Sequence, residues 1–262
     1  MSGSESRGWL AHGVLWAILA FLYVPIAIMI QMAFNRSPLY ELPFVFDLVW
    51  FRELAGNERL LNASFNSLWI ALVNAAIATT LGTLVAYAFA RYEFRGKRVL
   101  QLLLFPPITI PWLIIGTSML VFFFWTGIGR GLHAILLGHV ALSLPYVIVV
   151  VGARFQAVDV TLEEAALTTG ASPVQVFTRI TLPLLAPGII AAALFAFAVS
   201  FDQFVISYFL APPGVSTLPV EIYSSIRKGF TPEINAVSTI IILTSMGLML
   251  AVSRFYKFGG ER

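Results

Sequence analysis

Long stretches without any charged residue constrain this chain more than any other feature of its sequence. Seven such runs are each 18 to 31 residues long, and a membrane-spanning helix needs about 20 mainly apolar residues. The runs cover 8–35, 60–90, 99–129, 131–153, 180–201, 203–220 and 234–253. Only 11% of the residues are charged and the mean hydropathy is +0.88, whereas ordinary soluble domains carry about 25% charged residues. This composition excludes a soluble globule, a disordered chain and a nucleic-acid-binding protein.

Six transmembrane helices are predicted from these runs. The run 203–220 contains Pro212-Pro213-Gly214, which ends a helix and forms a turn, so residues 204–210 extend the preceding span or lie at the membrane interface. The predicted spans are 9–34, 67–90, 100–125, 134–153, 184–209 and 234–254. All are apolar on every side, unlike the alternating strands of a membrane barrel. We therefore expect one all-α integral membrane domain over 1–262, whose first span is too long for a cleaved signal peptide.

Two of the predicted spans carry small residues at every fourth position. The series are Ala78, Gly82, Ala86 and Ala90 in the second span, and Gly188, Ala192, Ala196 and Ser200 in the fifth. Small side chains let two helix backbones approach closely in a membrane. These positions therefore predict helix–helix contacts rather than a direct role in transport.

The basic residues predict the orientation of the chain in the membrane. Ten of the 16 Lys and Arg residues fall on one side if that side holds the N-terminus, 91–98, 154–183 and the C-terminal tail. Loops rich in Lys and Arg stay in the cytoplasm. Both termini are then cytoplasmic, which requires an even number of spans and agrees with six.

The longest cytoplasmic loop, 154–183, carries signals for two short helices. Thr161 with Glu164 fits a capping box that starts a helix over 162–169, which Gly170 ends. Ser172-Pro173-Val-Gln175 starts a second helix, which Leu182-Pro183 is expected to end. The first helix is expected to expose Glu163 and Glu164 and to keep Ala165, Ala166 and Leu167 as a small apolar face. Such a pair fits a groove on another protein, and it equally fits an ordinary interfacial helix pair.

The spacing within this loop resembles a known family signature. Glu164-Ala165-Ala166, then Gly170, Ile180 and Leu182-Pro183 are similar to the EAA motif of permease subunits in binding-protein-dependent ABC importers. The resemblance implies the type I ABC importer permease fold, with Glu163, Glu164, Ala165, Ala166 and Gly170 in a segment that couples to an ATPase. It also implies a bacterial inner-membrane protein with three kinds of partner: a second homologous permease, two copies of an ATPase subunit and a periplasmic substrate-binding protein. ATP and Mg would be bound by the ATPase, with no cofactor in this chain.

A narrower resemblance lies near the C-terminus. Ser200-Phe-Asp202-Gln203-Phe-Val205-Ile-Ser207 and Pro232-Glu233-Ile234-Asn235-Ala236 are similar to the second permease subunit of spermidine/putrescine importers. That subfamily typically has two adjacent acids where this chain has Asp202-Gln203. Importers of 4-aminobutyrate, opines or other small solutes therefore remain alternatives, and the single acid argues against sulfate or molybdate.

No residue pattern for bond chemistry occurs in the sequence. The chain lacks a GxxxxGK[ST] phosphate loop, so ATP is expected on a partner. His12, His133 and His139 lack metal-ligand spacing, and no nucleophile motif is present. We expect a non-enzymatic subunit without a metal. The rival from another class is a stand-alone secondary transporter, which needs no ATPase.

Asp202 is the one acid enclosed by apolar runs, and we expect it near the outer end of the fifth span. An ionisable group at membrane depth usually faces a bundle interior or a water-filled path. Phe201, Phe204 and Tyr208 are placed to add cation–π contacts for a cationic substrate, and Pro145 beside Tyr146 marks a kink of the type that lines transport cavities. A water-exposed aspartate, an aspartate paired with a partner subunit and a plain packing kink are the alternatives.

Overall fold

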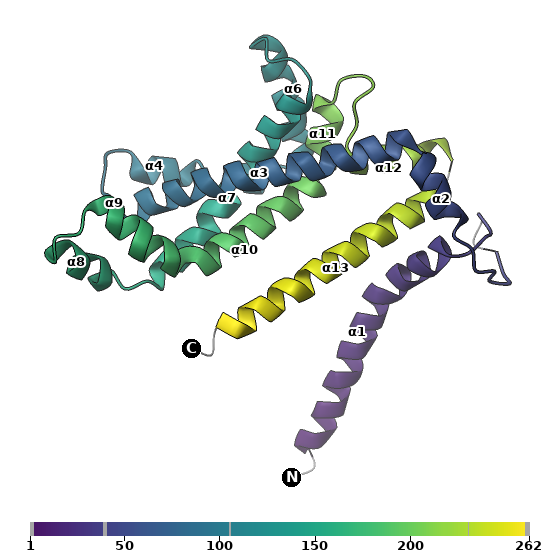
Figure 1. Cartoon of the computed structure of the whole chain (residues 1–262), viewed down its shortest axis with the longest axis horizontal. Helices are drawn as coiled ribbons and strands as arrows, with labels where there is room; N and C mark the ends of the chain where they lie inside the picture. Colours follow the sequence, from purple (N-terminus) through teal and green to yellow (C-terminus); the bar gives the residue numbers. More distant parts are fainter. Residues whose placement is uncertain (1–2, 39–40, 105, 230, 260–262) are drawn as a thin grey trace. The chain divides into compact units, whose positions relative to one another are not determined.

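The computed structural model describes residues 3–38, 41–104, 106–229 and 231–259 and is helical throughout, apart from loops and one isolated bridge between Asn35 and Phe46. Its contacts divide the chain into two compact units, one of residues 1–61 with 222–262 and one of residues 62–221 (Figure 1). This division groups the ends of the chain together and leaves the middle as a separate packed body. The expected single domain over 1–262 remains a prediction.

The first unit contains the first and the last of the predicted spans. Helix α1 (Gly3–Ala33) and helix α13 (Glu233–Gly259) contact each other, and α13 also contacts the short helix α2 (Val49–Gly56). After α1 the chain turns at Asn35, which is fully buried. Its side chain donates to Glu41 O at 3.1 Å and accepts from Val45 N at 3.1 Å. A buried side-chain amide needs such partners, so Asn35 closes the turn that follows the first span.

The second unit is built around three long helices, α3 (Glu58–Arg91), α7 (Leu132–Gln156) and α10 (Leu182–Phe201). Their shared core contains small residues of both predicted series together with the β-branched face of α7. The buried members of this core are Ala78, Ala86, Val147, Ile148, Val151, Phe155, Leu185, Ala192 and Ala196. A Cβ atom added at Gly82 would lie 2.5 Å from Val147 Cγ1, which is too close for two carbon atoms. The predicted close contacts between helices are therefore confirmed for these positions.

The third predicted span is broken rather than continuous. Helix α4 (Lys97–Leu102), helix α5 (Pro106–Thr109) and helix α6 (Trp112–Trp125) replace it, and the two arms are bent by 110°. Pro106, Pro107 and Pro111 each lack an N–H donor and clash with the preceding turn. Three prolines within six residues explain why the helix breaks there instead of only kinking.

The fifth predicted span differs from the expectation at both of its ends. Helix α9 (Pro173–Val176) runs through a π-helical turn (Phe177–Thr181) into α10, so Leu182-Pro183 does not end the helix. In the π turn, Leu182 N–H donates to Phe177 O, five residues back. Pro183 then lies in the first turn of α10, where proline is tolerated. At the far end, Asp202 and Gln203 separate α10 from helix α11 (Phe204–Leu210).

Four helices of the described residues are long and apolar enough to cross a membrane: His12–Ala33, Glu58–Arg91, Leu132–Gln156 and Pro173–Phe201. The bent pair Lys97–Thr109 and Trp112–Trp125 makes a fifth if it counts as one span. The apolar segment Glu233–Gly247 of α13 is shorter. The structure therefore confirms an all-helical protein with several spans, and the number six stays a prediction.

Candidate functional site

The loop 154–183 lies at one end of the second unit and contains the short helix α8 and the start of the helix that continues from α9 into α10 (Figure 1). The first short helix is as predicted, whereas the second does not end within the loop. Helix α8 (Thr161–Thr168) is followed by Gly170 at φ +92°, a conformation that glycine adopts without strain. The capping box at Ser172 is confirmed, because Gln175 N–H donates to Ser172 Oγ at 3.3 Å and Ser172 N–H donates to Gln175 Oε1 at 2.9 Å. Local sequence signals thus define the end of α8 and the start of α9.

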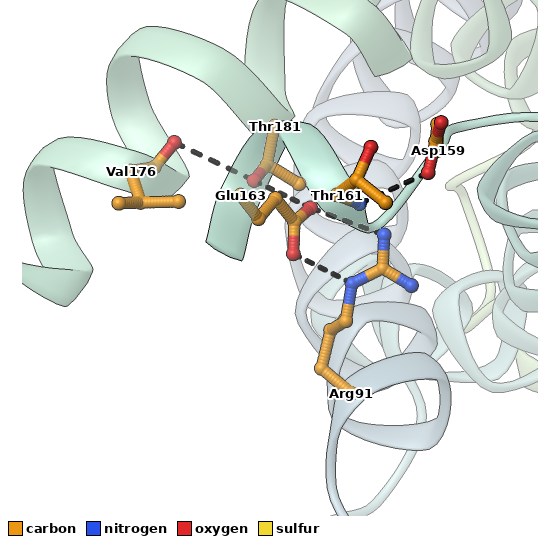
Figure 2. Close-up of polar contacts among 6 residues, drawn as sticks. All are labelled: Arg91, Asp159, Thr161, Glu163, Val176 and Thr181. Atoms are coloured by element: carbon orange, nitrogen blue, oxygen red, sulfur yellow. Dashed lines mark hydrogen bonds and ion pairs between the residues drawn. The ribbon is translucent and has the colours of Figure 1, made fainter. Parts of the chain in front are cut away.

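The start of α8 differs from its prediction. Thr161 is the first residue of the helix rather than its cap, and the expected capping box with Glu164 is absent. Asp159 Oδ1 instead accepts a hydrogen bond of 2.9 Å from Thr161 N–H (Figure 2). This bond, together with the Thr161 hydroxyl, lowers the pKa of the Asp159 carboxyl group. Asp159 thus satisfies the N–H of Thr161, one of the free donors at the helix start, whereas a Thr161 cap would have accepted from Glu164 N–H.

Glu163 is buried, and the expectation that it is exposed is wrong. Arg91 Nε donates to Glu163 Oε2 at 2.7 Å and Arg91 Nη2 donates to Oε1 at 3.1 Å (Figure 2). Thr181 Oγ1 donates to the same Oε1 at 2.9 Å. A carboxylate enters a protein interior only when charge and hydrogen bonds compensate its lost hydration, and these three bonds do so. Glu163 therefore faces the spans, with its side chain 8% exposed.

These contacts attach α8 to α3 and to the π-helical turn, and indirectly, through Arg91, to α7. Arg91 is the last residue of α3, and its guanidinium carbon lies 5.3 Å from the ring centre of Phe155 on α7. Thr181 ends the π-helical turn that leads into α10. Bidentate Arg–carboxylate pairs fix both distance and orientation. A displacement of α8 must therefore move the ends of these spans or break buried bonds.

The opposite face of α8 is open. Glu164 and Ala165 are exposed, Ala166 is half-buried, and Leu162 and Leu167 expose 49% and 47% of their surface. An acidic group flanked by exposed leucines on a short helix combines an apolar area with one charge. Of the five predicted coupling residues, Glu164, Ala165 and Gly170 are accessible, whereas Glu163 supports the helix from behind.

The second predicted cluster lies at the break of the fifth span. Asp202 is the exposed C-cap residue of α10. Phe201 stacks on Phe197 with ring centres 5.8 Å apart, and Phe204 lies 5.4 Å from Tyr208. Asp202 therefore lies between two aromatic pairs, one at the end of α10 and one within α11.

Pro145 and Tyr146 are not part of this cluster. Pro145 is buried within α7, and Tyr146 packs against Phe195 of α10 at 5.4 Å. Pro145 also lies inside a continuous helix rather than at a break. Tyr146 therefore belongs to the α7–α10 packing contact, and a pathway role for either residue stays a prediction.

Three polar residues at these sites escaped prediction from the sequence. Arg91 entered only as a topology charge, Thr181 had no assigned role, and His139 was considered only as a metal ligand. His139 is in fact buried on α7 between two serine hydroxyls. Each of these residues acts with a partner at least 18 positions away, so no local pattern reveals it.

Comparison with known proteins places these features in a family context. Residues 78–259 match the model of the family described as "Binding-protein-dependent transport system inner membrane component". The chain is 36% identical to the spermidine/putrescine transport system permease protein PotC of Haemophilus influenzae, over 94% of this chain and 95% of that protein. Its identity to PotC of Escherichia coli K12 is 37%, over 96% and 94%. Its identity to the putrescine transport system permease protein PotI of the same strain is 37%, over 92% and 88%.

Solved structures share the fold at lower sequence identity. One is a chain of a bacterial ABC transporter involved in the import of the acidic polysaccharide alginate, with a TM-score of 0.72, 16% identity and coverage of 98% of this chain and 99% of that chain. Another belongs to the MetNI methionine ABC transporter, with a TM-score of 0.65, 18% identity and coverage of 78% and 97%. The helix arrangement described above is therefore that of known importer membrane subunits.

Proposed function

The chain belongs to the family of binding-protein-dependent transport system inner membrane components, and we propose that it is the permease subunit of an ATP-driven polyamine importer. The observation that carries this proposal is the 36–37% identity, over nearly the whole chain, to permease subunits named for spermidine and putrescine transport. In this role the chain is a multi-pass subunit of a bacterial inner membrane and performs no bond chemistry itself.

The cargo within this class is the finer part of the proposal. Spermidine and putrescine are flexible cations, and an exposed carboxylate flanked by aromatic rings suits a cation. The chain has one acid, Asp202, where the polyamine subfamily typically has two, so an importer of 4-aminobutyrate or an opine is the alternative. A screen of these solutes separates the two possibilities.

The proposed complex contains a second homologous permease, two copies of an ATPase subunit and a periplasmic substrate-binding protein. ATP and Mg are bound by the ATPase subunits. With both termini and 154–183 in the cytoplasm, α8 lies on the same side of the membrane as ATP hydrolysis. We name residues 154–183 the coupling loop from here on.

In the proposed mechanism, α8 transmits movement of the ATPase to the spans. Glu164, Ala165 and Ala166, followed by Gly170, present the face that enters a cleft on the ATPase. Glu163 holds α8 to Arg91 and Thr181, so a shift of α8 is passed to α3 and α10. The membrane subunits then alternate between outward-open and inward-open states. Asp202 with Phe201, Phe204 and Tyr208 forms part of the pathway that the cation follows.

The test is reconstitution of the complex from its native membrane. The chain is purified with its bound partners, the partners are identified by mass spectrometry, and ATP hydrolysis is measured with and without the binding protein. Uptake of spermidine, putrescine, 4-aminobutyrate and octopine into proteoliposomes names the cargo. We expect a second permease, an ATPase and binding-protein-stimulated hydrolysis coupled to polyamine uptake.

Two results contradict the proposal in different ways. ATP-driven uptake of 4-aminobutyrate or an opine without polyamine uptake keeps the importer and corrects the cargo. Recovery of the chain alone, with solute flux in liposomes that lack ATP, supports the secondary transporter instead.

A further inference from the structure

One buried side chain bridges the break in the fifth span. His139 on α7 is 2% exposed. Its Nδ1 lies 2.8 Å from the hydroxyl of Ser200 on α10, and its Nε2 lies 3.1 Å from the hydroxyl of Ser207 on α11. Both serines are buried. A single imidazole therefore contacts the helical segments on both sides of Asp202 and Gln203.

The hydrogen-bond network defines the tautomer of this histidine. Ser207 Oγ donates its one proton to Gln203 O at 2.8 Å, so it must accept from His139 Nε2–H. Nδ1 is then the acceptor and takes the proton of Ser200 Oγ. Both ring nitrogens are satisfied, and the two directional bonds point to different helices. A neutral ring with this tautomer fits the site without any further partner.

The two segments joined by His139 have different surroundings. Helix α10 continues directly from α9 and the π-helical turn, whose Thr181 is bonded to Glu163 of α8. Helix α11 packs on α6 and α7, so closely that a Cβ atom at Gly138 would lie 2.6 Å from Ile206 Cγ2. Both segments therefore pack on α7, but α10 is continuous with the coupling loop, whereas α11 lies beyond the break and also packs on α6.

The polar groups at the break also show that this place is not ordinary core. Gln203 is 2% exposed, its Oε1 accepts from Val205 N–H at 3.1 Å, and its Nε2 has no hydrogen-bond partner among the described residues. An unmade bond of a buried amide is costly. A break with an unsatisfied amide needs other contacts to keep its geometry, and the two bonds of His139 supply them.

We propose that His139 is a positioning residue that holds α10 and α11 at a fixed angle across the break. It thereby fixes the positions of Asp202 and of the aromatic side chains of α11 when α10 moves together with the coupling loop. The angle itself is a property of the fold, whereas its consequence for uptake rests on the proposed transport function. The competing explanation is that His139 is only a well-bonded core residue.

A triple variant separates these two roles. H139L/S200A/S207A removes the ring and both hydroxyls together, so that neither of the two His139 bonds leaves an unsatisfied group behind. Gln203 O loses the Ser207 hydroxyl, and we expect the fold to be retained. H139Q keeps a donor at the position of Nε2 and tests partial rescue. S143A is the matched control, because Ser143 is a buried serine one turn from His139 whose hydroxyl accepts from Asn74 Nδ2 at 3.0 Å and not from α11.

The assembled complex is measured in two ways. Uptake per ATP hydrolysed is determined in proteoliposomes with spermidine. Spin labels are attached to I190C in α10 and to P213C beyond α11, and pulsed electron paramagnetic resonance gives the distribution of distances between them. The native chain has no cysteine, so only these two positions of the chain are labelled. Both label positions are exposed.

We expect the triple variant to assemble and to hydrolyse ATP normally. Uptake per ATP should fall about fivefold or more, because loss of one ordinary hydrogen bond changes an equilibrium by about that factor. Its label distances should broaden, H139Q should recover part of both properties, and S143A should match the native chain. Native uptake per ATP or native distances in the triple variant would overturn the proposal. If the native complex imports no polyamine, the proposed function fails separately, and the distance distributions alone decide the role of His139.

Discussion

At the scale of single residues, the pair Glu163–Arg91 carries a specific prediction. E163Q leaves the guanidinium of Arg91, whose side chain is 16% exposed, without its charge partner, and breaking such a pair costs about 3 kcal/mol or more. We expect α8 to detach locally, so that hydrogen exchange of its amides accelerates by about a hundredfold. Uptake per ATP should fall while membrane insertion is unchanged.

The neighbouring glutamate is the matched control for this experiment. Glu164 is exposed, so E164Q should leave hydrogen exchange of α8 unchanged. It should still weaken association with the ATPase, because this carboxylate lies on the face proposed to dock. Equal exchange rates in E163Q and E164Q would contradict the supporting role of Glu163.

Asp202 carries a second residue-scale prediction. D202N removes the negative charge at the break and preserves the size of the side chain. We expect the KM for spermidine uptake to rise about fivefold, because a partly hydrated ionic contact contributes about 1 kcal/mol. Assembly and basal ATP hydrolysis should not change. The control is E53Q, since Glu53 is an exposed carboxylate in α2, outside the predicted spans and the coupling loop. Unchanged uptake kinetics in D202N would remove Asp202 from the pathway.

At the scale of helices, close packing of α3 on α7 can be tested by a single methyl group. G82A places a Cβ atom 2.5 Å from Val147 Cγ1, and overpacking of this kind costs about 1–3 kcal/mol. G152A is the control, because Gly152 is also helical and has no atom within 4 Å of its added Cβ. Both substitutions gain the same helix propensity. We expect G82A to lower the melting temperature of the purified complex by a few degrees relative to G152A.

At the scale of the whole molecule, the orientation of the chain is open to direct measurement. The native chain has no cysteine, so single cysteines report accessibility without background. R95C and P213C, both at exposed positions, should react with a membrane-impermeant maleimide from opposite sides of the membrane. Cysteines in the two terminal segments should react from the same side as R95C. Labelling of the termini from opposite sides would mean an odd number of spans.

The sequence alone predicted the helical membrane class, the family and much of the local structure of the coupling loop. These features depend on interactions within a few residues or on overall composition. Gly170 ends α8 because of its own backbone freedom, and the Ser172–Gln175 capping box closes over one turn. The small-residue series reports helix contacts because size alone decides how closely two backbones approach.

Expectations were less accurate where one local signal competes with another. Three prolines break the third span. Pro183, in contrast, lies in a helix that continues from the π-helical turn into α10. Thr161 fitted the pattern of a cap, but it is the first residue of α8, and its own N–H donates to Asp159. Proline and threonine patterns indicate only that a helix tends to begin or end nearby. The neighbouring turns decide which of the competing hydrogen-bond arrangements forms.

Composition and short-range spacing thus determined by themselves that this chain is a helical membrane protein with an EAA-type loop, because hydropathy and capping act locally. Only the tertiary structure decided that Glu163 faces inward to Arg91 and Thr181, and that His139 joins both halves of the fifth span. These partners are separated by 18 to 72 residues in the chain. Buried polar groups require specific partners, and which partners meet depends on how the long helices pack.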